Sequence, residues 1–88
     1  MVCKRAFVSG FVQGVAFRYF TMLEAKSLKI SGYARNLWDG RVEVVAKGDA
    51  ESVDQLMAWL HQGSPMAKVS GVVIESDFEW NGRGFTTH

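Results

Sequence analysis

The chain has 88 residues and a formal net charge of +1 at pH 7, with 48% hydrophobic and 22% charged residues. So small a charge gives little long-range field, which argues against extensive nucleic-acid binding and against attachment to an acidic membrane surface. The length and the ordinary composition predict one domain over residues 1–88, with no disordered segment and no internal repeat.

The single cysteine, Cys3, cannot form a disulfide within the chain. Neither a secretory leader nor a transmembrane run is visible, so we expect a cytoplasmic protein. A lone cysteine near a terminus is more typical of a small apolar filler than of a nucleophile.

The first predicted strand covers about residues 5–11, where Ala6 and Val8 fall on one face and Phe7 and Ser9 on the other. A glycine-containing loop follows it, and a helix is predicted from Phe17 to about residue 28. The residues on one arc of that helix suit a buried face: Phe17, Thr21, Ala25 and Leu28.

A β-hairpin is the next predicted element, with strands over residues 33–38 and 41–47. The dipeptide Asp39-Gly40 between them is typical of a two-residue turn that needs positive φ angles. We therefore expect a tight two-residue connection at this point.

A second helix is predicted after Asp49, which suits the N-cap position, and it ends before Gly63 and Pro65. Its apolar residues have the spacing of a buried stripe: Val53, Leu56, Met57 and Leu60. A long strand over about residues 69–78 follows, and Asn81-Gly82 turns the chain toward a short fifth strand around Phe85.

The element order βαββαβ predicts an α+β ferredoxin-like split βαβ sandwich. Two helices would pack on one face of an antiparallel sheet with the main strands ordered 4-1-3-2, beside a short fifth strand. Because a βαβ crossover makes the first two strands parallel, their carboxyl ends share one sheet edge.

The loop from Gly10 to Arg18 follows the first predicted strand, so it lies where the carboxyl ends of the first two strands meet. The N–H groups in a strand-to-helix turn have no intrahelical partners, and the positive end of the helix dipole lies beside them. Arg18 opposes that dipole, and its guanidinium offers a fork of donors to phosphate oxygens. The loop is therefore a candidate anion site.

The loop reads Gly10-Phe11-Val12-Gln13-Gly14-Val15-Ala16-Phe17-Arg18 and closely resembles the acylphosphatase signature G-x-V-Q-G-V-x-F-R. Acylphosphatases are small enzymes that hydrolyse carboxyl-phosphate mixed anhydrides. The resemblance continues over residues 32–37 and 39–48, and the chain length suits one whole acylphosphatase-like domain.

The resemblance implies that Arg18 and the loop Gln13, Gly14, Val15, Ala16 and Phe17 bind the phosphate, and that Asn36 positions the attacking water. The small-molecule substrate would be an acyl phosphate, cleaved to a carboxylate and inorganic phosphate. Arg18 and Asn36 cannot accept the water proton, so a substrate phosphate oxygen is expected to do so. No metal or organic cofactor, nucleic acid or membrane is implied, and we expect a monomer.

Several alternatives compete with these assignments. Gly10 and Gly14 could merely build a tight loop, and Asn36 could serve only a turn or an edge strand. We expect Gln13 and Ala16 to contribute main-chain amides rather than side-chain chemistry. RNA binding shares the βαββαβ topology, but the third strand lacks the aromatic pattern of RNA-recognition domains. A third possible function, after acyl-phosphate hydrolysis and RNA binding, is that of a noncatalytic phosphate sensor or protein-interaction module.

Overall fold

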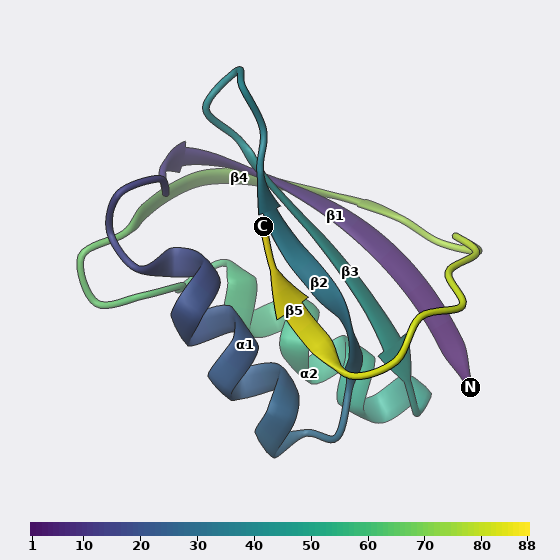
Figure 1. The fold of residues 1–88 in the computed structure, drawn as a ribbon. Coiled ribbons are helices and arrows are strands. Elements are labelled where there is room, and N and C mark those ends of the chain that lie inside the picture. Colours follow the sequence, from purple (N-terminus) through teal and green to yellow (C-terminus); the bar gives the residue numbers. More distant parts are fainter.

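The computed structural model describes residues 1–88 and places the two helices on one face of a five-stranded sheet (Figure 1). The elements in chain order are β1 (Val2–Phe11), α1 (Phe17–Ser27), β2 (Ser31–Asn36), β3 (Val42–Gly48), α2 (Ala50–Leu60), β4 (Lys68–Glu75) and β5 (Phe85–Thr87). This is the predicted βαββαβ order with its short fifth strand. Neither α1 nor α2, each of 11 residues, could span a membrane.

The sheet has the strand order β4-β1-β3-β2-β5, so the predicted order of the main strands is confirmed. β1 pairs with β3 and β4, and β2 pairs with β3, all in antiparallel fashion. β5 instead lies parallel to β2, which makes the complete sheet mixed. Residues 76–84 connect β4, the outer strand on one side of the sheet, to β5, the outer strand on the other side, and Figure 1 shows β5 running beside β2.

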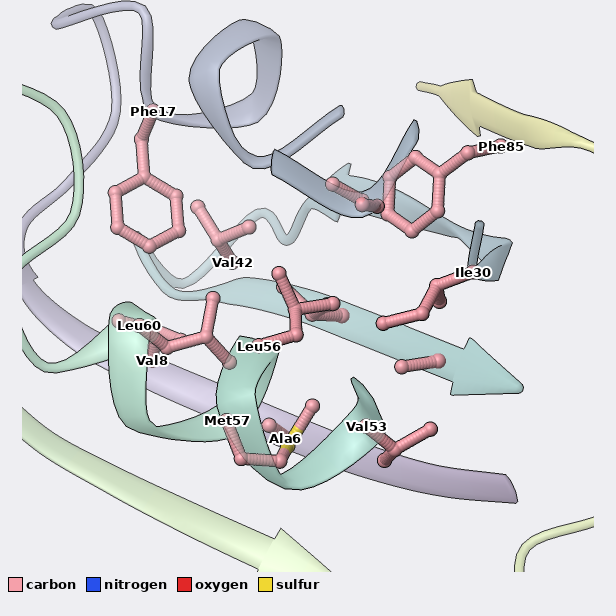
Figure 2. Packing of buried hydrophobic residues seen from close by; sticks show 14 of the residues in the cluster. Ala6, Val8, Phe17, Ile30, Val42, Val53, Leu56, Met57, Leu60 and Phe85 are labelled. Atoms are coloured by element: carbon pink, nitrogen blue, oxygen red, sulfur yellow. The ribbon is translucent and has the colours of Figure 1, made fainter. Parts of the chain in front are cut away.

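The hydrophobic core lies between the helices and the sheet, as the periodicities predict. Ala6 and Val8 of β1 are fully buried and stand opposite Val44 and Val42 of β3. The predicted stripe of α2 is buried in full: Val53, Leu56, Met57 and Leu60. Figure 2 shows Phe17 pointing from the start of α1 into the same cluster.

Some predicted boundaries are wrong by a few residues. β1 starts at Val2 rather than near residue 5, because its pairing with β3 extends to Val2 opposite Gly48. β4 ends at Glu75, since its pairing with β1 stops there and the chain leaves the sheet edge. Asp49 takes the N-cap position of α2, but its side chain makes no capping hydrogen bond.

The predicted two-residue turn is also wrong, although the hairpin itself is present. β2 ends at Asn36 and β3 starts at Val42, so residues 37–41 form the connection. The carboxylate of Asp39 accepts the Arg41 N–H at 3.1 Å, which removes that donor from the strand ladder. This hydrogen bond, with the Arg41 side chain, lowers the pKa of Asp39.

Gly10 lies inside β1, at a bulge where the register with β4 shifts between Ser9 and Gly10. Its φ angle is 119°, and a Cβ atom there would lie 2.2 Å from the main-chain oxygen of Lys68. The glycine thus lets β4 approach β1 just before the loop begins.

We expect Gly10→Ala to lower the free energy of unfolding by at least about 2 kcal/mol, because the methyl group meets backbone and the φ angle is unfavourable. Gly71→Ala in β4 is the matched control, since its Cβ would meet nothing within 4 Å. That control should change stability by less than about 1 kcal/mol. Urea denaturation measures both, and equal effects would contradict the assigned role of Gly10.

Candidate active site

The β1–α1 loop presents its main-chain N–H groups without partners in the protein. No hydrogen bond is donated by the N–H of any residue from Gln13 to Ala16. Gly14 and Ala16 have left-handed φ angles of 77° and 61°, and Ala16 is the N-cap of α1 with no side-chain cap. Successive N–H groups in such a turn form a concave site for an anion.

The end of α2 and the α2–β4 loop pack against the start of α1. The Phe17 ring is 1% exposed and lies 6.0 Å from the Trp59 ring, between ring centroids. A Cβ on Gly63 would lie 2.5 Å from that phenyl ring, so the two loops are in close contact. The start of α1 is therefore held by packing rather than by a capping side chain.

Ser64 fixes the direction of one loop peptide. Its side chain is nearly fully buried, and its hydroxyl donates to the Val15 main-chain oxygen at 2.8 Å. In a planar trans peptide the N–H points opposite to the C=O. The hydrogen bond from Ser64 therefore turns the N–H of Ala16 away from the interior, toward the open side of the loop.

Arg18 lies in the first turn of α1 and reaches His88, the residue after β5. Its Nη1 donates to the main-chain oxygen of His88 at 2.6 Å. A hollow of about 170 Å³ opens at this point. It is lined by Val12, Gly14, Ala16, Phe17, Arg18, Tyr19 and Thr87.

Asn36 is the last residue of β2 and contacts the same residue, His88. Its N–H donates to the main-chain oxygen of His88 at 3.0 Å, the oxygen that also accepts from Arg18. The Oδ1 atom of Asn36 is buried and has no hydrogen-bond partner in the protein. Such an unpaired acceptor requires an explanation, and a ligand or water donor supplies one.

The topology thus brings Arg18 and Asn36 to one sheet edge, as predicted, although Asn36 is not among the residues that line the hollow. Sequence reasoning missed three groups that organise this edge: Ser64, the main-chain oxygen of His88 and the side chain of Gln13. The Gln13 amide donates to the main-chain oxygens of Leu37 and Arg41. The side chain of Gln13 thus has a structural role that the sequence pattern did not indicate, whereas the contribution of its main-chain amide to the site stays a prediction.

Other reactive side chains lie away from this edge. Cys3 stands near the start of β1, at the opposite end of that strand from the loop. Burial raises the pKa of its thiol, which disfavours the nucleophilic thiolate. No group of three or more His, Cys, Asp or Glu side chains has the arrangement of a metal site.

Comparison with known proteins supports the family resemblance of the sequence. The acylphosphatase family model matches residues 4–87. An acylphosphatase from Rubrobacter xylanophilus is 51% identical over 82 residues, which is 92% of this chain and 74% of that protein. An acylphosphatase from Alkalilimnicola ehrlichii is 49% identical over 82 residues, covering 93% of this chain and 92% of that one.

A solved structure gives the same result at the level of the fold. The crystal structure of an acylphosphatase from Bacillus subtilis superimposes with a TM-score of 0.94 at 35% sequence identity, covering 100% of this chain and 99% of that chain. The chain therefore belongs to the acylphosphatase family.

We expect Ser64→Ala to lower the free energy of unfolding by about 1–3 kcal/mol, because it leaves the partly buried Val15 oxygen without its donor. Ser27→Ala is the matched control: Ser27 also donates to a main-chain oxygen at 2.8 Å, but it is exposed. The control should change stability by less than about 0.5 kcal/mol. Thermal and urea unfolding compare the two, and equal losses would contradict the role given to Ser64.

Proposed function

We propose that the β1–α1 loop, Arg18 and Asn36 together carry out the acyl-phosphate hydrolysis that belongs to this family of hydrolases. The family match over residues 4–87 supports treating residues 1–88 as one acylphosphatase-like domain. The proposal assigns a role to each group at the edge where β1 and β2 end.

The phosphoryl group binds to the free N–H groups of residues 13–17 and to Arg18. These donors are fixed before the ligand arrives, because the loop is held by Ser64 and by the packing of Phe17. Arg18 has used Nη1 for His88, and its other N–H groups can donate to phosphate oxygens. Preorganised donors of this kind stabilise the negative charge of an in-line phosphoryl transfer.

Asn36 orients the attacking water. Its Oδ1 accepts a hydrogen bond from that water, which directs an oxygen lone pair toward phosphorus. The buried, unpartnered Oδ1, on a residue that shares the His88 oxygen with Arg18, is the observation that carries this proposal. An edge-strand role alone would leave that acceptor unexplained.

The bond between phosphorus and the acyl oxygen breaks as the water oxygen bonds to phosphorus. The products are a carboxylate, which is a good leaving group, and inorganic phosphate. Neither a guanidinium nor a neutral amide can take up the water proton, so a phosphate oxygen of the substrate accepts it. The protein then needs no covalent nucleophile and no titrating base.

Arg18→Ala is expected to weaken phosphate binding and to reduce kcat/KM for acetyl phosphate by about 10²–10³-fold, because a charged transition-state donor is lost. Arg83→Ala, at an exposed arginine, is the matched control and should behave like wild type. Phosphate release is measured over time, with circular dichroism to verify folding. Wild-type turnover by folded Arg18→Ala would remove Arg18 from the mechanism.

Asn36→Ala should chiefly lower kcat, by about 10²-fold or more, while the affinity for inorganic phosphate stays close to wild type, because the loop and Arg18 are intact. Asn81→Ala, an exposed asparagine, is its control. The assay is acetyl phosphate hydrolysis beside a phosphate titration. Unchanged turnover in a folded variant would reject water positioning, and binding without turnover in wild type would favour a noncatalytic phosphate sensor.

A further inference from the structure

The side chain of Gln13 joins the β1–α1 loop to the connection between β2 and β3. Its Nε2 donates to the main-chain oxygen of Leu37 at 2.7 Å and to that of Arg41 at 2.9 Å. Both neighbours are acceptors, so the amide must point its nitrogen toward them. Gln13 is partly buried and lies 24 residues from Leu37 in the chain.

The hairpin connection does not need Gln13 to keep its own shape. The Leu37 N–H donates to the Arg41 oxygen at 2.8 Å, and the Gly40 N–H donates to the Leu37 oxygen at 3.2 Å. Gln13 adds further hydrogen bonds to oxygens that already have partners. Its bonds therefore act between the two loops rather than within either of them.

The loop also has supports of its own. Val12 and Phe17 are each 1% exposed, and Ser64 holds the Val15 oxygen. Loss of the Gln13 amide leaves these contacts in place, so the free N–H groups and Arg18 keep their arrangement. Asn36 immediately precedes Leu37 and pairs with Val42, which follows Arg41, so the two Gln13 bonds connect the loop to the strand ends that hold Asn36.

We propose that Gln13 is a positioning residue that fixes Asn36 relative to the phosphate-binding loop. This inference rests on the proposed function, because it gives Gln13 no contact with the reacting atoms and lets it act through Asn36. A water held about 1 Å from its productive position can lower the rate by about 10²-fold, so even a small drift of the hairpin has a large effect.

The first test compares Gln13→Met with wild type. Methionine has a similar length but no donor. We expect kcat for acetyl phosphate to fall by about 10–100-fold, with the dissociation constant for inorganic phosphate within about 3-fold of wild type. Gln55→Met, at an exposed glutamine of α2, is the matched control and should match wild type. A purely structural role would lower phosphate affinity and turnover together, which would overturn the proposal.

The deciding test is a double-mutant cycle between Gln13→Met and Asn36→Ala. If Gln13 acts through Asn36, removing Gln13 from the Asn36→Ala protein should lower kcat by less than about 3-fold. Independent, multiplied losses would overturn the proposal. If Gln13→Met does not fold, Gln13→Leu takes its place in the cycle, with phosphate binding as the measure of an intact loop.

The two proposals can fail separately. Normal turnover by Asn36→Ala overturns water positioning and the inference that rests on it. A large loss in Asn36→Ala, together with normal turnover in folded Gln13→Met, leaves the proposed function standing and rejects the role of Gln13 alone.

Discussion

The structure depends on a short backbone segment, residues 13–16, whose main-chain N–H groups donate no hydrogen bond to the protein. Unpaired amides do not hold a loop in place, so other contacts must do it. Ala16 takes a left-handed conformation, which costs about 1–2 kcal/mol for a residue with a Cβ. The buried Phe17 ring and the hydroxyl of Ser64, from the adjacent α2–β4 loop, offset that strain.

The parallel relation of β1 and β2 explains how two separate segments meet at one edge. α1 returns the chain so that both strands end on the same side, and β5 then adds itself beside β2. The main-chain oxygen of His88, the residue after β5, accepts from both Arg18 and Asn36 and so links the side chain of a helix to the end of a strand. The Arg18 guanidinium and the Asn36 main-chain N–H, from different elements, thus donate to the same oxygen, and the Gln13 side chain adds a second connection between the loop and the hairpin.

Much of this arrangement was predictable from the sequence because it follows from local rules. Period-two and helical spacing predicted the buried faces of β1 and α2, and the crossover placed Arg18 and Asn36 at one edge. The side-chain contacts of Gln13 and Ser64 were not predictable, because they join residues 24 and 49 positions apart with no local pattern. The prediction of a two-residue turn at Asp39-Gly40 was wrong because the Asp39 carboxylate accepts the Arg41 N–H, which a two-residue hairpin would use in its ladder.

The sheet face opposite the helices shows why the chemistry is confined to the loop edge. Glu43 is 2% exposed, and it pairs with Arg35 at 2.6 Å and with Arg5 at 3.5 Å. Arg5 also lies 4.4 Å from the ring centroid of Phe78 and 5.1 Å from that of Phe7. RNA recognition by such a face needs free cations and free rings on which bases can stack. On this face Arg5 and Arg35 form ion pairs with Glu43, and Arg5 also lies against the rings of Phe7 and Phe78. At the loop, by contrast, the N–H groups and the Asn36 oxygen have no partner in the protein. The charged groups of the open face are thus paired with one another, whereas the loop keeps donors and Asn36 an acceptor that a ligand or water can use.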